Sequence, residues 1–280
     1  MNDEDLQFYP VKADEDVYES KRTFKEPLQK PPFVKIIVGG KGSGKTSALV
    51  SELIRSNMYG DRKKEEPVFD DIILFSGTLG SDSTSRHLVK KCSLVSNTYN
   101  DEDISHIVDY QTSKDKKDRR HICLIADDIA SMIKGRECEI YKLTSIHRHH
   151  LISMYYLVQN PKMIPPVARS NASSYYIYRL PSSKEQEKIF EDLSFLGDSK
   201  MIKDLYDVST DKPYHFLYVD VLKNEAWKWG ASQPKFLWSK YNEKGGYNPP
   251  FRKNRKEKED VDENNIIENN VNNSDEENNI

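Results

Sequence analysis

One stretch of eight residues constrains this chain more than any other, because it matches every fixed position of the phosphate-binding pattern G-x-x-x-x-G-K-[ST]. The stretch is Gly39, Gly40, Lys41, Gly42, Ser43, Gly44, Lys45 and Thr46. It follows a largely apolar, β-branched run at 33–38, and it leads into residues 46–54, which have the pattern of a helix. A strand, a glycine turn and a helix in this order predict a P-loop that binds a nucleoside triphosphate.

Each residue type in this stretch has a physical role in binding phosphate. Glycines let successive backbone N–H groups point inward, and the following helix directs its positive dipole end at the phosphates. We expect Lys45 to reach the β- and γ-phosphate oxygens of ATP and the Thr46 hydroxyl to ligate Mg2+. The predicted nucleotide-binding residues are Gly39, Gly40, Lys41, Gly42, Ser43, Gly44, Lys45, Thr46 and Ser47. The alternative is a glycine-rich turn without a ligand.

Further apolar runs alternate with helical patterns along the chain. We expect strands at 33–38, 71–76, 121–128, 152–160, 175–178 and 214–220. We expect helices at 46–54, around 104–108 and 139–144, and at 183–193. Residues 161–171 contain three prolines and are expected to form a stiff loop. The alternation predicts an α/β fold, with a mostly parallel central sheet covered by helices on both faces.

The two ends of the chain differ from its centre. Residues 1–30 carry many charges with little periodicity, which predicts an arm that packs on the domain or stays mobile. The P-loop domain is expected over 31–240. Residues 241–280 are rich in glycine, proline, asparagine and acids, and they are predicted to form a disordered acidic tail.

The net charge of −3 is unevenly distributed. From Glu257 onward there are nine acids and one lysine, which leaves 41 basic and 36 acidic residues in the rest of the chain. This mildly basic part permits contact with nucleic acid without establishing it. The charged loop at 114–120 either contacts a phosphate backbone or is solvated, and solvation is the commoner case.

The sequence contains no recognisable membrane or export signal. No apolar run approaches the roughly 20 residues of a membrane span, and the acidic start at 1–5 is unlike a signal peptide. Cys92, Cys123 and Cys138 lie far apart and form no C-x-x-C pair, which indicates reduced thiols. We therefore expect an intracellular protein with no membrane segment.

Two adjacent carboxylates follow the apolar run that begins at His121. A strand that ends in acids places them at the carboxyl edge of a parallel sheet, where open α/β folds bind ligands. We expect Asp127 to hold Mg2+, and Asp128 to orient or deprotonate the attacking water. A simple turn at the end of a strand is the alternative.

A polar side chain also ends the predicted strand at 152–160. In P-loop proteins that insert one strand between the P-loop strand and the Mg2+ strand, such a residue senses the γ-phosphate. Gln159 fits this role, and an amide that caps the strand is the alternative. The three histidines around Arg148 do not indicate a metal site, because no acid or cysteine lies at ligand spacing beside them.

Four features together resemble the poxvirus-type DNA-packaging ATPases of large DNA viruses, virophages and related elements, a branch of the FtsK and HerA superfamily. They are the P-loop at 39–46, the run 124–128, Arg148-His149 ahead of the strand that ends in Gln159, and Ile164-Pro165 followed by 169–171. The resemblance covers about residues 33–180. Many relatives in the wider superfamily carry Glu where this chain has Asp128, a departure that bears on the identity of the catalytic base.

The resemblance implies a RecA-like core that assembles into a homo-oligomeric ring. Such a ring threads double-stranded DNA, without sequence preference, into a preformed capsid while it hydrolyses ATP with Mg2+. Its partners would then be DNA and the portal or vertex proteins of the capsid. Its location would be the viral assembly site in the host cell, with the virion as a further location.

Two arginines are candidates for a finger that acts on the nucleotide of a neighbouring subunit. Arg148 is the first, because it lies between the helix after the Mg2+ strand and the strand of Gln159, where ring ATPases of this type often present a cation. Arg169 is the second. The alternative is an ordinary surface or DNA-contacting arginine.

Two other classes of function compete with a translocase. A nucleoside monophosphate kinase also uses a P-loop, but it needs an arginine-rich lid and an acceptor site. A non-hydrolysing nucleotide-dependent scaffold needs neither Asp128 nor Gln159. Trp227, Trp229 and Trp238 alternate with lysines and either stack on bases or, more commonly, pack on the domain.

Overall fold

A computed structural model describes residues 22–62, 65–77, 85–129, 132–133 and 138–241. The chain divides into two units, Met1–Leu237 and Trp238–Ile280, and the first contains the elements discussed below except the last two residues of the final strand. The predicted acidic tail lies outside the described residues apart from Tyr241. Among the described helices, none has both the length and the apolar character that a membrane span requires.

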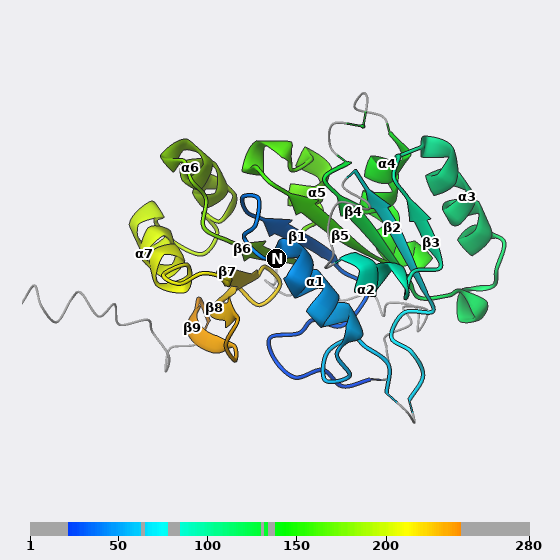
Figure 1. Ribbon diagram of the computed structural model, residues 1–280, viewed down its shortest axis with the longest axis horizontal. Helices are drawn as coiled ribbons and strands as arrows, with labels where there is room; N and C mark the ends of the chain where they lie inside the picture. The colour runs from blue at the N-terminus through cyan, green and yellow to red at the C-terminus, as the bar shows by residue number, and fades with distance from the viewer. Residues whose placement is uncertain (1–21, 63–64, 78–84, 130–131, 134–137, 242–280) are drawn as a thin grey trace, which may run out of the picture. The chain divides into compact units, whose positions relative to one another are not determined.

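The strands form one sheet in the order β3-β2-β4-β5-β1-β6-β7-β8-β9 (Figure 1). Their bounds are β1 Val34–Val38, β2 Asp71–Ser76, β3 Leu94–Ser96, β4 Ile122–Asp127, β5 Ile152–Val158, β6 Ser174–Ile177, β7 His215–Asp220, β8 Glu225–Gly230 and β9 Lys235–Ser239. In this order, neighbouring strands from β3 through β6 pair in parallel, whereas β7 is antiparallel to β6 and to β8. The mostly parallel sheet is confirmed, and β5 lies between β1 and β4 as the interpretation of Gln159 required.

Helices cover both faces of the sheet. They are α1 Lys45–Ile54, α2 Ser85–Val89, α3 Asp101–Thr112, α4 Glu139–Ile146, α5 Pro166–Asn171, α6 Ser183–Asp192 and α7 Ser199–Ser209, with short 3-10 turns η2 Lys116–Asp118, η4 His147–His150 and η5 Pro161–Met163. Leu157 of β5 packs in one cluster with Leu49 and Leu53 of α1, while its neighbour Tyr156 bonds to Thr144 of α4. Because successive strand residues point to opposite faces, α1 and α4 lie on opposite sides of the sheet. Figure 1 shows α1 and α2 together on the near side.

The predicted loop at 161–171 is partly helical, and that prediction was wrong in its second half. Pro166 stands in the first turn of α5, where the missing N–H of proline costs no hydrogen bond and its fixed φ suits a helix. The prolines therefore start the helix. Helices α2 and α7 and strands β3, β8 and β9 were not predicted.

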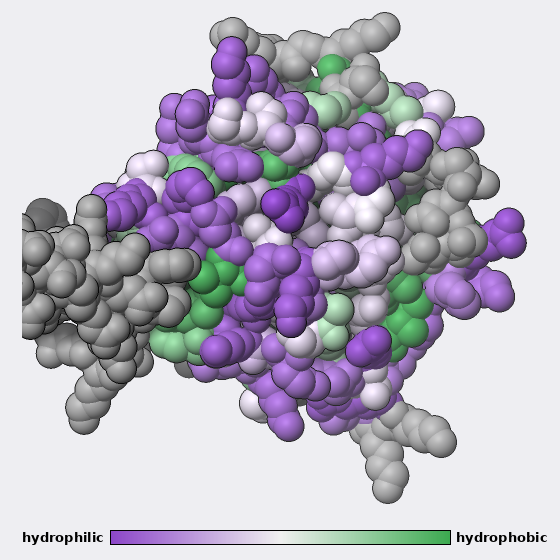
Figure 2. All heavy atoms as spheres, turned by 60° about the vertical axis from the view of Figure 1, so that its left-hand side comes forward, coloured by the Kyte–Doolittle hydropathy of each residue, from purple (hydrophilic) through white to green (hydrophobic). Residues whose placement is uncertain are grey.

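The packing of Trp229 decides between base stacking and packing on the domain for that residue. Trp229 is 6% exposed and lies 5.9 Å, between ring centroids, from both Phe216 and Tyr176. Trp227 meets Phe236 edge to face at 5.0 Å. Base stacking is therefore excluded for Trp229, whose rings are part of the core. Charged and polar side chains cover much of the face in Figure 2, with apolar side chains in small patches.

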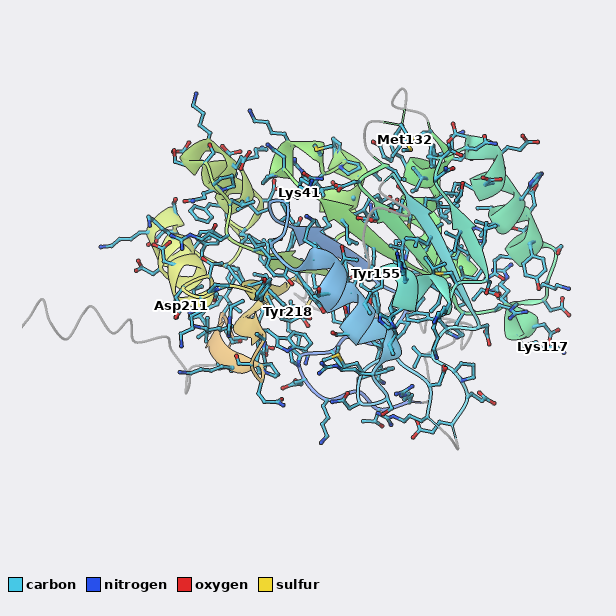
Figure 3. The ribbon with its side chains drawn as sticks, viewed as in Figure 1. Lys41, Lys117, Met132, Tyr155, Asp211 and Tyr218 are labelled. Atoms are coloured by element: carbon cyan, nitrogen blue, oxygen red, sulfur yellow. The ribbon has the colours of Figure 1, made fainter. Side chains whose placement is uncertain are left out.

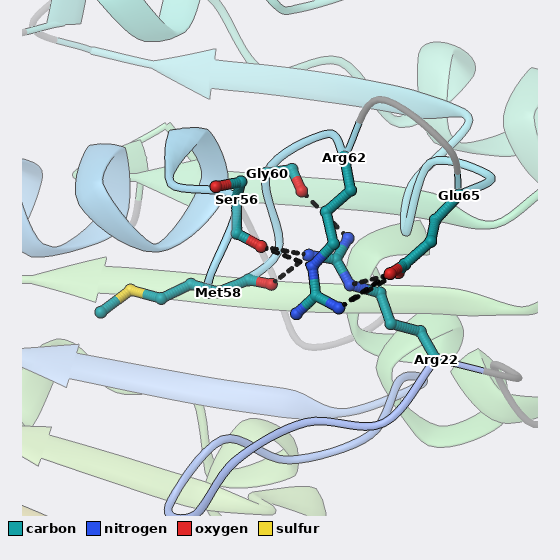
Figure 4. Close-up of polar contacts among 6 residues, drawn as sticks. All are labelled: Arg22, Ser56, Met58, Gly60, Arg62 and Glu65. Atoms are coloured by element: carbon teal, nitrogen blue, oxygen red, sulfur yellow. Dashed lines mark hydrogen bonds and ion pairs between the residues drawn. The ribbon is translucent and has the colours of Figure 1, made fainter.

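The described part of the arm, residues 22–30, packs on the domain. The Arg22 guanidinium donates to the carbonyl oxygens of Ser56 at 2.6 Å, Met58 at 2.9 Å and Gly60 at 2.9 Å (Figure 4). These carbonyls belong to the turn that follows α1, outside the hydrogen-bond ladder of the helix. The arginine therefore fixes the turn after the P-loop helix.

One residue of the P-loop strand is a buried lysine. The Lys35 side chain is fully buried, and its ammonium forms an ion pair with Glu52 of α1 and a 2.9 Å hydrogen bond to the Tyr59 hydroxyl. The Tyr176 hydroxyl donates to Glu52 at 2.8 Å. The ammonium also lies 4.2 Å from the ring centroid of Phe33. Tyr155 and Tyr218, which belong to the same hydrophobic core as Phe33, are labelled in Figure 3. Burial lowers the pKa of Lys35, and the Glu52 carboxylate counteracts this.

We predict that Lys35→Met lowers the free energy of unfolding by about 3–5 kcal/mol, because the Glu52 carboxylate would stay buried without its counterion. Lys35→Met combined with Glu52→Gln should recover part of this loss, since the introduced amide would be neutral and could still accept from Tyr176. Urea unfolding measures both. Lys203→Met, which breaks the exposed pair with Asp207, is the control and should change stability by less than about 1 kcal/mol. A similar small effect of Lys35→Met would contradict the prediction.

Candidate nucleotide site

The P-loop connects β1 to α1 and has the geometry of a phosphate cradle. A Cβ atom at position 39 would lie 2.5 Å from the Cβ of Tyr178, so only glycine fits there. Gly44 has a φ of 103°, in the left-handed region that side chains disfavour. Lys45 begins α1, and its ammonium donates to the carbonyl oxygens of Gly39 at 2.8 Å and Gly40 at 3.3 Å. The ammonium therefore lies within the loop that the glycines form.

Two carboxylates lie close to this lysine. Burial lowers the pKa of Lys45, and the negative charges of Asp128 and Asp127 act in the opposite direction. Asp127 is the last residue of β4, and its Oδ2 accepts a 2.7 Å hydrogen bond from the Ser76 hydroxyl at the end of β2. The structure thus brings Lys45 and both predicted acids into one site at the carboxyl edge of the sheet.

Gln159 joins the same site from β5. Its Nε2 donates to Asp128 Oδ2 at 2.7 Å, and Asp128 itself has a φ of 52°, so the chain turns sharply after β4. This contact exists because β5 lies between β1 and β4. Gln159 therefore contacts the acid that was predicted to activate water.

Two buried polar atoms of the site have no hydrogen-bond partner within the described part of the chain. They are the Ser43 hydroxyl oxygen and Asp128 Oδ1. A hydroxyl in the cradle can donate to a phosphate oxygen, and a free carboxylate oxygen can accept from water. Both atoms fit the ligands that the sequence predicts.

The side chains also fit Mg2+ bound together with a nucleotide. Among the described residues, no group of three or more His, Cys, Asp or Glu could hold a metal by itself. Mg2+ bound with nucleotides takes one or two protein oxygens and completes its shell with phosphate oxygens and water. Asp127 and Thr46 would supply such oxygens.

Comparison with protein families shows to which family this chain belongs. A family described as "Poxvirus A32 protein" matches residues 87–226, which is half of the 280 residues. The chain belongs to this family. The resemblance to poxvirus-type packaging ATPases is thus confirmed, and the match includes Asp127, Asp128 and Gln159 but begins after the P-loop.

Solved structures share the fold of this A32-family protein. The genome packaging NTPase B204 from Sulfolobus turreted icosahedral virus 2, in complex with AMP, is 18% identical with a TM-score of 0.51, and the match covers 71% of this chain and 96% of that chain. Its complex with ATP-gammaS is 17% identical with a TM-score of 0.51, and the match covers 74% of this chain and 98% of that chain. B204, the DNA-packaging ATPase from Sulfolobus turreted icosahedral virus, is 18% identical with a TM-score of 0.50, and the match covers 73% of this chain and 97% of that chain. None of the curated proteins matches the chain at a significant level.

The two candidate arginines of this A32-family protein lie in different environments. Arg148 is exposed in η4, which precedes β5, whereas Gln159 follows the same strand. The seven residues of β5 span about 20 Å, so Arg148 lies at the sheet edge opposite its own P-loop. Arg169 is largely buried and donates to the Pro161 carbonyl at 2.6 Å, and it forms an ion pair with Asp192 at 3.4 Å. Arg169 therefore joins α5 to η5 and α6.

The other charged groups that drew attention in the sequence lie away from the P-loop. Lys117 of the charged loop and Lys41 of the P-loop occupy widely separated places in Figure 3. His147 is buried, and one ring nitrogen lies 2.9 Å from the Ile152 carbonyl oxygen. Burial lowers the pKa of His147 to about 4, so the ring is neutral near pH 7 and has a structural role.

Sequence reasoning missed Ser76 as a member of the site. Ser76 ends β2 and donates to Asp127, so it orients the predicted Mg2+ ligand. The signal was available, because Ser76 is a polar residue at the end of a predicted strand, as Asp127 and Gln159 are.

We predict that Asp128→Asn retains binding of ATP and Mg2+ but lowers turnover by about 10²-fold or more, because water activation is lost while Asp127 is kept. Asp127→Asn should weaken Mg2+-dependent nucleotide binding. Equilibrium binding and steady-state hydrolysis, each titrated with Mg2+, measure these effects. Should Asp127→Asn keep its Mg2+ dependence and lose turnover while Asp128→Asn stays active, the two roles are reversed.

Proposed function

We propose that this protein is an ATP-hydrolysing DNA translocase, which packages double-stranded viral DNA into a preformed capsid as a homo-oligomeric ring. The observation that supports this most is the grouping of Lys45, Asp127, Asp128 and Gln159 at one sheet edge in a member of the A32 family. B204, which shares the fold, is described as a genome packaging NTPase. The work would take place at the viral assembly site, with portal or vertex proteins as capsid partners.

The proposed chemistry assigns a step to each side chain. The P-loop backbone and Lys45 would hold the β- and γ-phosphates, and Thr46 and Asp127 would hold Mg2+, which would supply positive charge beside the transferring phosphoryl group. Asp128 accepts a proton from, or orients, the attacking water. Gln159 donates to Asp128 and can donate instead to a γ-phosphate oxygen. Its amide can thus report loss of that phosphate to the acid beside it.

The hydrogen bond between Gln159 and Asp128 favours hydrolysis over a nucleotide-dependent scaffold. A nucleotide-dependent scaffold needs the cradle but no positioned acid and amide beside it. A nucleoside monophosphate kinase would transfer phosphate to a second nucleotide and would turn over without DNA.

We predict that duplex DNA stimulates ATP hydrolysis by the assembled protein and that Lys45→Ala abolishes hydrolysis with and without DNA. DNA binding should show no sequence preference and should weaken steeply as salt rises, because lysines and arginines that meet phosphates release counterions. Hydrolysis rates and fluorescence anisotropy at several salt concentrations provide the measurements. Hydrolysis indifferent to DNA, or binding to one sequence only, would argue for another function.

We further predict that Arg148 acts on the nucleotide of the neighbouring subunit, because it lies at the edge opposite its own P-loop and is exposed. Arg148→Ala should lower turnover by about 10³-fold. Mixing it with Lys45→Ala subunits, which keep the arginine, should restore activity. Full activity of Arg148→Ala alone, or no rescue in demonstrably mixed assemblies, would remove Arg148 from the mechanism. Arg169→Ala is the comparison, and its contacts with Pro161 and Asp192 predict a loss of stability instead.

A further inference from the structure

A groove of about 890 Å³ opens beside the P-loop. It is lined by Gly44 and α1 with Ser47 and Ser51, by Tyr214 and the segment 230–234 at the end of β8, and by residues 25–28 of the arm; it extends along α1 as far as Met58. Figure 1 shows β7 and β8 on this side of α1. The volume lies within the usual range of about 300–1,000 Å³ for sites that bind small molecules.

Two tyrosines of this groove meet the P-loop at the same residue. The Tyr178 hydroxyl donates to the Gly44 carbonyl oxygen at 3.2 Å. A Cβ atom built on Gly44 would lie 3.0 Å from Cδ1 of Tyr214. The Tyr214 ring therefore lies against the residue that immediately precedes Lys45.

The backbone around Tyr214 is closely packed and fixes the place of this residue. Tyr214 has a φ of 61°, a conformation that costs free energy for a residue with a bulky side chain. Gly230 has a φ of 127°, and a Cβ atom there would lie 2.2 Å from the Tyr214 carbonyl oxygen. The end of β8 thus packs directly on this turn, while Tyr214 as a whole is 61% exposed. The backbone thus fixes the place of a largely exposed aromatic side chain beside Gly44.

The direction of a bound triphosphate follows from the site. Asp127, Asp128 and Gln159 lie on the β4 and β5 side of the P-loop, which is where the γ-phosphate must be for hydrolysis. The nucleoside, attached at the other end of the triphosphate, must leave toward the β6 and β7 side. The groove begins on that side at Gly44 and Ser47.

We propose that this groove binds the nucleoside of the triphosphate and that Tyr214 stacks on its base. The proposal rests on the proposed nucleotide binding at the P-loop and adds the location of the base. Every base has an aromatic face, so stacking on a tyrosine supplies affinity with little choice among bases. The residues that would line the base and ribose are Ser47, Ala48, Ser51, Tyr178, Tyr214 and Gln233.

The test compares ATP with inorganic tripolyphosphate, which has the phosphates but no nucleoside. Equilibrium binding of both to the full chain is measured with Mg2+ by titration calorimetry. Tyr214→Ala should weaken ATP binding about tenfold or more and leave tripolyphosphate binding within about twofold of the unchanged chain, whereas Tyr214→Phe should keep both affinities. Tyr110→Ala, which changes a partly exposed tyrosine on α3, is the matched control and should alter neither.

A second variant tests the groove without changing the tyrosine. Ser51→Phe should fill the groove from α1 and weaken ATP binding but not tripolyphosphate binding. Equal losses for both ligands in Tyr214→Ala, or no loss for either, would overturn the proposal. If the unchanged chain binds neither ligand, the proposed nucleotide function fails instead. If it binds tripolyphosphate as tightly as ATP, only the nucleoside groove is refuted.

Discussion

The buried ion pair between Lys35 and Glu52 is the interaction on which the rest of the site depends. Lys35 lies in β1 and Glu52 in α1, so the pair joins the two elements that the P-loop connects. Removing both charges from water is costly, and good geometry with additional hydrogen bonds is needed to offset that cost. The hydroxyls of Tyr59 and Tyr176 supply such bonds, and Tyr59 also donates to the Gln29 carbonyl of the arm at 2.6 Å. The strand, the helix and the arm are thereby fixed relative to one another, which holds the cradle in shape.

The order of the strands accounts for the chemistry beside the cradle. Because β5 lies between β1 and β4, the residues after β5 meet those after β4, and Gln159 reaches Asp128. The same parallel arrangement sends the segment before β5 to the other edge of the sheet, so Arg148 lies away from its own P-loop. One strand thus carries a residue for its own site at one end and, in our proposal, a residue for the neighbouring subunit's site at the other.

The two sides of the P-loop differ in chemical character. Charged and amide groups lie on the β4 and β5 side, where phosphate would be hydrolysed. Aromatic side chains lie on the β6 to β8 side, where Tyr178 and Tyr214 contact Gly44. The antiparallel strands β7 and β8 therefore extend the fold and also form one wall of the groove that the nucleoside would occupy.

Local patterns in the sequence were sufficient to predict the P-loop, most of the parallel strands and the places of Asp127, Asp128 and Gln159 at the ends of strands. Glycine spacing, apolar runs and polar strand ends are all properties of neighbouring residues. Tertiary structure alone decided the rest. Lys35 sits in a run that was interpreted as a plain buried strand, and only the fold brings Glu52 and the aromatic rings around it. Tyr214 reaches the distant Gly44 because β7 lies beside β6 in the sheet, and Arg22 caps carbonyls that follow α1. A sequence pattern reports which side chains are buried, but the partner of a buried charge or of a distant ring depends on which elements pack together.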